Sequence, residues 1–197
     1  MNWPTVLVLA SGRSERFVAS GGTGSKLQAR LAHKTVLQHT LDAVTASGLP
    51  WHLEDAGHPG MGDSIAAAVR ATWRNAAKTG WLILPGDLPL IQSTTLRAVA
   101  SALMQHRVVV PSYQGQRGHP VGFAPECGAS LRQLHGEHGA ASIAHKHPAF
   151  ELDLDDIGCI TDVDTLADLS TAQRLLHGAT GATARSIGST LKQTPDH

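Results

Sequence analysis

The chain has little cysteine and no net charge, and both facts exclude functions. Its 197 residues include two cysteines, Cys127 and Cys159, which lie far apart in the sequence and form no CxxC pair. Two reduced thiols are therefore favoured over a disulfide framework or a thiolate metal site. The 16 basic and 16 acidic residues cancel. No overall field favours nucleic acid or a membrane surface as a partner, so any anion site must be local.

Long hydrophobic runs are also absent. No stretch approaches the roughly 20 apolar residues that a membrane span needs. The first residues, MNWPTVLVLAS, lack the basic segment that opens a signal peptide. We therefore expect a cytoplasmic protein without membrane association. Hydrophobic residues make up 42% of the chain, which suffices for one compact core at this length.

The glycine-rich signatures of two common nucleotide-binding loops are missing as well. A dinucleotide fingerprint needs GxGxxG, whereas the loop after the first apolar run reads SGRSER. A Walker A loop needs GxxxxGK[ST], whereas GGTGSKL has Ser25 before Lys26 and Leu27 after it. Neither signature is met.

What is present is an alternation of short apolar runs and amphipathic stretches. Apolar or alternating segments at 5–9, 49–56, 81–87, 107–111 and 150–154 predict strands. Helical spacing predicts a helix that ends at Gly48, a second that is capped by Asp63 or Ser64, and further helices around 96–103 and 166–176. Strands that alternate with helices predict an α/β domain over residues 1–177, with a mostly parallel sheet flanked by helices. Residues 178–197 are small and polar and are expected to form a flexible tail.

The stretch TVLVLASGRSERF raises the possibility of an anion site. In parallel sheets, ligands bind at the carboxyl ends of the strands, and small residues there leave backbone N–H groups free to cradle phosphate oxygens. Arg13, Arg16 and Lys26 would supply the countercharge, with Lys26 on a surface loop. The alternative is a merely flexible connector.

Two acidic segments suggest a hard metal ion. Asp87 in PGDLPL follows a buried strand and would point to the same sheet edge, where its oxygens suit Mg²⁺; the alternative is that it only caps the turn. Asp162 and Asp164 precede the last helix, where capping by Asp164 or Thr165 is compatible with metal binding.

Six motifs occur in the order seen in MobA-like NTP transferases, and the chain resembles the molybdenum cofactor cytidylyltransferase branch of that family. The motifs are LASGRSERF with the downstream Lys26, GMGDSI at 60–65, LPGDLPL at 84–90, GQRGHPVGF at 115–123, LHGEHGA at 134–140 and DVDTLADL at 162–169. The resemblance implies a Rossmann-like sheet of the glycosyltransferase-A type. It also implies transfer of NMP, with CTP as the expected donor or else another NTP, to the terminal phosphate of a molybdopterin-type acceptor, with Mg²⁺ or Mn²⁺ as cofactor.

The resemblance also assigns residues to roles. Catalysis would fall to Arg16, Lys26 and Asp87. The nucleotide would be held by Leu9, Ala10, Ser11, Gly12, Arg13, Ser14, Lys26, Asp63, Ser64 and Asp87. The acceptor side would comprise Gly118, His119 and Pro120, although His119 also suits a structural turn. The metal ligands would be Asp87, Asp162 and Asp164.

The chain departs from the family pattern in places that leave other functions open. Ser11 stands where the family usually has Ala, the segment between Arg16 and Lys26 is about five residues longer than usual, and only about a dozen residues separate Gly48 from GMGDS, so that one βα unit is missing. A sugar phosphate or methylerythritol phosphate acceptor is one alternative. A catalytically weak carrier or chaperone that holds the cofactor for a molybdoenzyme is another. The expected partners are small molecules, with a molybdoenzyme or its chaperone as a further candidate.

Overall fold

The strands form where the sequence has its short apolar runs. The computed structural model describes residues 3–189. In this range one sheet contains seven strands: β1 (Thr5–Leu9), β4 (Trp51–Glu54), β5 (Trp81–Pro85), β6 (Val108–Tyr113), β7 (Gln116–Arg117), β8 (Val121–Phe123) and β9 (Ala149–Asp153). A separate small hairpin joins β2 (Arg30–Leu31) to β3 (Lys34–Thr35).

The sheet is mixed but mostly parallel, as expected. Its order is β4-β1-β5-β8-β6-β7, and β9 pairs with β6. β4 and β5 run parallel to β1, and β9 runs parallel to β6. Because β5 and β6 are both antiparallel to β8, they share one direction, so that only β8 and β7 run against the other five strands. β1 and β5 are thus central parallel neighbours.

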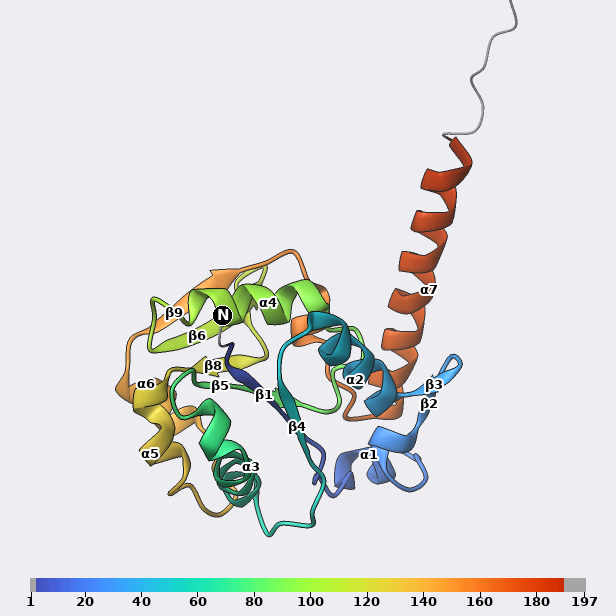
Figure 1. Ribbon diagram of the computed structural model, residues 1–197. Helices are drawn as coiled ribbons and strands as arrows, with labels where there is room; N and C mark the ends of the chain where they lie inside the picture. Colours follow the sequence, from blue (N-terminus) through green and yellow to red (C-terminus); the bar gives the residue numbers. More distant parts are fainter. Residues whose placement is uncertain (1–2, 190–197) are drawn as a thin grey trace, which may run out of the picture.

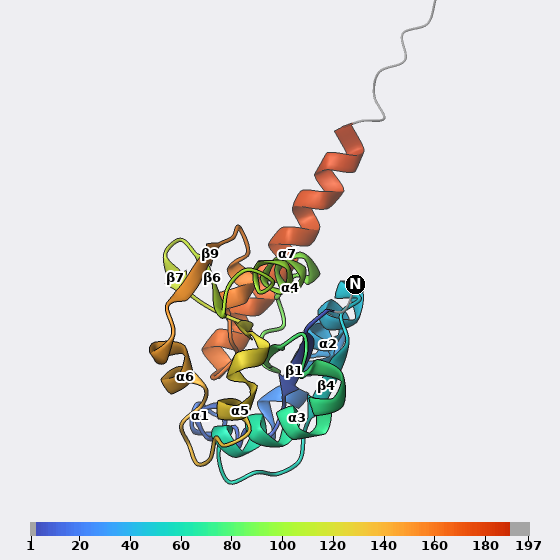
Figure 2. The same ribbon diagram turned by 60° about the vertical axis from the view of Figure 1, so that its left-hand side comes forward.

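Helices cover both faces of the sheet, which gives the three layers seen in Figures 1 and 2. The helices are α1 (Glu15–Ala19), α2 (Val36–Ser47), α3 (Met61–Ala76), α4 (Ser93–Ala102), α5 (Gly128–Leu131), α6 (Ala141–Lys146) and α7 (Leu166–Ser189). Val6 and Val8 of β1 pack against α2 and α4, whereas Leu7 packs against α3 and α5. This alternation follows from the two-residue period of a strand and makes β1 buried on both faces.

Local signals fix the ends of the first long helix. The Thr35 hydroxyl accepts a hydrogen bond from the backbone of Gln38, and the Gln38 side chain accepts one from the backbone of Thr35, which is a capping box. The helix ends at Gly48, which has a φ of 69°, a conformation that glycine adopts without steric cost. The predicted end at Gly48 is confirmed.

The expected N-cap of α3 is wrong. Gly60 is the N-cap, so the helix begins two to three residues before Asp63 and Ser64. Both side chains are engaged elsewhere: Asp63 accepts a hydrogen bond from the backbone of Gly136, and the Ser64 hydroxyl lies 2.6 Å from that of Ser11. Tertiary contacts here override the local capping preference.

A third apolar cluster lies between α1, the hairpin and α7. It comprises Phe17, Leu27, Leu31, Val36, Val163 and Ala172. Phe17 is 2% exposed, and Gly22 packs directly on its ring. The longer segment between Arg16 and Lys26 is therefore folded onto the domain. Arg16 and Lys26, which flank it, both pair with Asp164 just before α7.

Helix α7 passes through the expected domain boundary. The helix extends to Ser189, so residues 178–189 are helical in the structure rather than the expected coil. In Figure 1, this end of α7 projects away from the sheet. Residues 190–197 of the expected tail lie outside the described residues, and the division at residue 177 stays a prediction.

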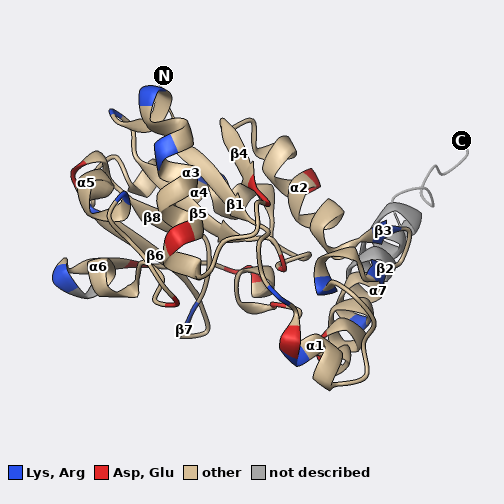
Figure 3. Ribbon diagram, turned by 90° about the horizontal axis from the view of Figure 1, so that it is seen from below, with Lys and Arg blue, Asp and Glu red and all other residues tan. Residues whose placement is uncertain are grey.

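Charged residues lie on several elements of the fold. In the view of Figure 3, segments with Lys or Arg and segments with Asp or Glu occur side by side. The two cysteines are buried and free, as expected. Within residues 3–189, no helix has the length and apolar composition required to cross a membrane.

Candidate active site

A cleft lies at the carboxyl ends of the central parallel strands. Leu9 of β1 pairs with Pro85 of β5, so the loops that follow these strands begin at the same edge. The backbone of Gly86 donates to Leu9, and the backbone of Ala10 donates to Glu54 at the end of β4. These bonds align three strand ends around a cleft of about 770 Å³.

Most of the residues predicted for the site line this cleft. They are Leu9, Ser11, Gly12, Arg13, Ser14, Arg16, Lys26, Ser64, Asp87, Gly118, His119, Asp162 and Asp164. Ala10, Asp63 and Pro120 are not among the lining residues. The carboxylate of Asp63 accepts a hydrogen bond from the backbone of Gly136, and its assignment to the nucleotide stays a prediction.

Lys26 lines the cleft and lies between two carboxylates. Its Nζ is 2.5 Å from Oδ2 of Asp87 and 2.5 Å from Oδ1 of Asp164. Burial alone would lower the pKa of Lys26, but the two carboxylates outweigh it and raise the pKa above its ordinary value. Lys26 is therefore a buried ammonium, with a side chain only 12% exposed, and the expected surface position is wrong.

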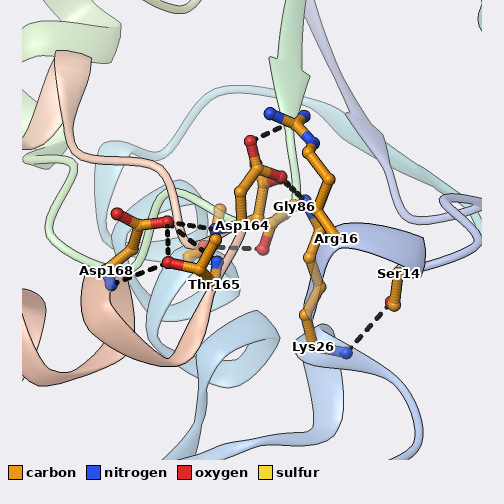
Figure 4. A network of polar contacts seen from close by, with 9 residues as sticks. Ser14, Arg16, Lys26, Gly86, Asp164, Thr165 and Asp168 are labelled. Atoms are coloured by element: carbon orange, nitrogen blue, oxygen red, sulfur yellow. Dashed lines mark hydrogen bonds and ion pairs between the residues drawn. The ribbon is translucent and has the colours of Figure 1, made fainter. Parts of the chain in front are cut away.

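Arg16 contacts the carboxylate of Asp164 from the solvent side. Its Nη2 lies 2.7 Å from Oδ2 of Asp164, and its side chain remains 76% exposed. Figure 4 shows Arg16 and Lys26 converging on this group. The exposed guanidinium is thus free to contact a ligand as well, since a planar guanidinium carries several donors.

The turn before Lys26 is fastened by Ser14. Ser14 adopts a left-handed conformation with a φ of 58°, and its hydroxyl accepts a hydrogen bond of 3.0 Å from the backbone N–H of Lys26. The contact is drawn in Figure 4. It holds the loop after β1 against the segment that carries Lys26.

Asp87 does not cap its turn through its side chain. Its Oδ2 contacts Lys26, and its buried Oδ1 has no hydrogen-bond partner. A buried carboxylate oxygen without a partner is costly, and a cation or a hydrogen-bond donor would remove that cost. The backbone carbonyl of Asp87 accepts a bond from Val163, which brings the DVD segment to the same place.

The capping of α7 leaves Asp164 free for the cleft. The Thr165 hydroxyl accepts from the backbone of Asp168, and the Asp168 carboxylate accepts from the backbone and hydroxyl of Thr165 (Figure 4). Of the two capping candidates, Thr165 therefore takes this position. Partial burial, with further contributions from Asp164 and Asp87, raises the pKa of Asp162.

The three predicted metal ligands do not form a ready-made metal site. Within residues 3–189, no group of three or more His, Cys, Asp or Glu is arranged to hold a metal ion. Lys26 takes up one oxygen each of Asp87 and Asp164. The unpartnered Oδ1 of Asp87 nonetheless fits a hard cation, as do the oxygen donors of Asp162 and Asp164.

Gly118 and His119 of the GHP segment, residues 118–120, also line the cleft. A Cβ on Gly118 would lie 2.2 Å from the backbone oxygen of Cys159, so this position has no space for a side chain. The backbone of His119 donates to the same oxygen at 2.8 Å. Burial lowers the pKa of His119, and its buried Nδ1 has no hydrogen-bond partner.

Sequence reasoning missed Glu54 and His58. Glu54 is 8% exposed and contacts Nε2 of His58 at 3.0 Å and Nε2 of His52 at 3.4 Å. His58 lines the cleft beside Pro59 and Met61. The available signal was an acidic residue at the end of a strand, the same feature that identified Asp87.

The sheet order and the cleft at its carboxyl edge define an α/β protein of the Rossmann-like class. The chain belongs to the MobA-like NTP transferase domain family, whose profile matches residues 42–150, more than half of the chain. The expected family is thereby confirmed. Residues 9–26 and 162–164 lie outside the matched range.

Individual relatives are similar to this chain over differing shares of their length. A phosphoenolpyruvate guanylyltransferase of Mycolicibacterium paratuberculosis is 33% identical over 138 residues, which are 66% of this chain and 57% of that protein. The chain thus matches little more than half the length of this curated relative.

Solved structures support the fold. Rv0371c from Mycobacterium tuberculosis H37Rv has a TM-score of 0.72 and 25% identity, over 88% of this chain and 98% of that one. Its manganese complex has a TM-score of 0.69 and 24% identity, with the same coverage. Molybdopterin-guanine dinucleotide biosynthesis protein A from Archaeoglobus fulgidus has a TM-score of 0.63 and 14% identity, over 88% and 99%.

Proposed function

We propose that this protein is a nucleotidyltransferase that transfers NMP from an NTP to the terminal phosphate of a small-molecule acceptor and releases pyrophosphate. The observation that carries the proposal is the meeting of Arg16 and Lys26 with Asp87 and Asp164 in one cleft. Phosphoryl chemistry needs cations to hold the triphosphate and carboxylates to hold a divalent cation. Family membership supports the same reaction.

The loop after β1 would bind the triphosphate. Space around Gly12 is open, so the backbone N–H groups of residues 11–14 can approach phosphate oxygens closely. Arg13 and Arg16 are exposed beside this loop. Leu9 and the hydroxyls of Ser11 and Ser64, which line the cleft, would contact the remainder of the nucleotide.

Asp87, with Asp162 and Asp164, would hold Mg²⁺ or Mn²⁺. Such an ion neutralises charge on phosphate oxygens and orients them. The acceptor phosphate is already anionic, so no side chain has to deprotonate it. The task of the residues is to align two anions that repel each other. Gly118 and His119 would face the acceptor.

Two substrate pairs are candidates. The motif pattern favours CTP and a molybdopterin-type acceptor, in which case a molybdoenzyme or its chaperone would receive the product. The phosphoenolpyruvate guanylyltransferase that is 33% identical to this chain favours GTP and phosphoenolpyruvate. Both pairs present a terminal phosphate to the same cleft.

A substrate matrix tests the proposal. Each of the four NTPs is combined with molybdopterin, phosphoenolpyruvate or methylerythritol phosphate in the presence of Mg²⁺ or Mn²⁺, and pyrophosphate release is measured. We expect turnover with one acceptor and one preferred NTP, and none after Asp87→Asn. If molybdopterin binds tightly but no combination releases pyrophosphate, the carrier alternative is the correct one.

A further inference from the structure

The ammonium of Lys26 occupies the position that a metal ion shared by Asp87 and Asp164 would occupy. Its Nζ is equally close, at 2.5 Å, to one oxygen of Asp87 and one of Asp164. A metal ion bound to the same two oxygens would need nearly the same position, because metal–oxygen distances are about 2.0–2.6 Å. The ammonium and the metal therefore exclude each other by contact and by charge.

The ammonium of Lys26 does not satisfy every oxygen of Asp87 and Asp164. Asp87 is 9% exposed, and its buried Oδ1 remains without a partner. One positive charge on Lys26 leaves this oxygen unsatisfied, whereas a divalent cation accepts several oxygen ligands. This buried oxygen is therefore a potential ligand for a cation that binds several oxygens.

The backbone of Lys26 is held in place, whereas its side chain can move toward the loop after β1. Ser14 anchors its backbone N–H, and the neighbouring Leu27 is buried in the third apolar cluster. Any movement is therefore confined to the side chain. The phosphate-binding loop with its open space at Gly12 lines the same cleft, and triphosphate oxygens there would offer the ammonium a new anionic partner.

We propose that Lys26 serves as the cation of the nucleotide-free site, and that the divalent metal replaces it only when nucleotide phosphates draw the ammonium away from Asp87 and Asp164. This inference rests on the proposed function, because it assumes that an NTP binds the loop. Its consequence is that the free protein has low affinity for the metal. Nucleotide and metal then bind with positive coupling.

The test measures Mn²⁺ binding to the nucleotide-free protein by calorimetry. Lys26→Met removes the ammonium and keeps an unbranched apolar stem; Lys34→Met is the matched control, because Lys34 pairs with Asp42 in an exposed position. We expect Lys26→Met to bind Mn²⁺ at least about tenfold more tightly than wild type, and Lys34→Met to equal wild type. The gain must vanish in Lys26→Met/Asp87→Asn, since the added metal is assigned to Asp87. Equal affinity of wild type and Lys26→Met overturns the inference.

A second measurement avoids dependence on a folded variant. Lysine side chains of the wild-type protein are labelled for NMR, and the Lys26 signal is followed with Mg²⁺ alone and with a non-hydrolysable CTP or GTP analogue in EDTA. We expect the analogue to shift this signal without metal, and Mg²⁺ alone to leave it unchanged. A shift by Mg²⁺ alone contradicts the inference. Neither measurement involves turnover. If the enzyme transfers NMP but Lys26 is not replaced by the metal, only the inference is refuted. If Lys26 is replaced by the metal but no NMP is transferred, only the proposed function is refuted.

Discussion

Glu54 fixes the orientation of His58, since Oε1 of Glu54 lies 3.0 Å from Nε2 of the imidazole. The carboxylate sits at the end of β4 and the ring lines the cleft. Held in this way, His58 presents its other nitrogen in a restricted set of directions. His58 lines the cleft together with Pro59 and Met61, and Glu54 supports it from the end of β4.

Glu54→Gln should lower stability at neutral pH. Burial alone would raise the pKa of Glu54, but hydrogen bonds from His58 and His52 outweigh it and hold the pKa below its ordinary 4.5. A depressed pKa means that the stabilisation is present above 4.5 and is lost as the pH falls through the folded-state value. We expect a loss of about 1–3 kcal/mol in unfolding free energy at neutral pH, measured by chemical denaturation. If the difference in unfolding free energy between wild type and Glu54→Gln stays constant into the acid range, this prediction is wrong.

Lys26→Met should impair both transfer and stability. Loss of a cation on the triphosphate should reduce turnover by roughly 10²–10³-fold. Removal of one partner from a buried ion pair should cost up to about 3–5 kcal/mol. Because the carboxylates raise the pKa of Lys26, its stabilisation is present below the ordinary 10.5 and is lost only as the pH rises through the higher folded-state value. Denaturation curves of wild type and variant should therefore converge only in strong alkali.

The sequence predicted the elements whose apolar pattern is long and regular. β1, β5, α2 and α4 followed from such patterns. β7 was missed because it has two exposed residues, Gln116 and Arg117, which carry no periodicity.

Other features of the site depend on tertiary packing. Lys26 is buried because its neighbour Leu27 packs in the cluster around Phe17 and Val163. No local sequence motif predicts this cluster. The role of Asp63 follows from its contact with Gly136, 73 residues away. The hydrogen bond of Asp63 depends on how α3 packs against the loop at 135–139. The sequence alone offered only capping or nucleotide binding for this residue.

Asp162→Asn should stabilise the metal-free protein at neutral pH. Partial burial, with Asp164 and Asp87 nearby, raises the pKa of Asp162 above its ordinary 3.8, so its charged form is disfavoured by folding. The folded state binds this proton more tightly than the unfolded state, so the penalty is present above the raised pKa and disappears below 3.8. Thermal unfolding should show a higher midpoint for the variant at neutral pH and equal midpoints in acid. A lower midpoint at neutral pH would show that Asp162 stabilises the metal-free fold.

Gly118→Ala should separate the acceptor side from the nucleotide side. The added Cβ would meet the Cys159 carbonyl at 2.2 Å, and the same carbonyl accepts the bond from the backbone of His119. The clash should displace His119 and cost about 1–3 kcal/mol of stability, as overpacking does. The loop after β1 is held by contacts of its own, such as the bond from the Lys26 backbone to Ser14, and should keep its geometry.

The expected kinetic result is a raised KM for the acceptor with little change in NTP affinity, measured by steady-state pyrophosphate release and by calorimetry with a non-hydrolysable NTP. Gly57→Ala is the control, because a Cβ there meets no atom within 4 Å, and Gly57 is not among the cleft-lining residues. It should match wild type in both measurements. Equal losses of NTP and acceptor binding in Gly118→Ala would mean that the GHP segment supports the whole cleft rather than its acceptor side.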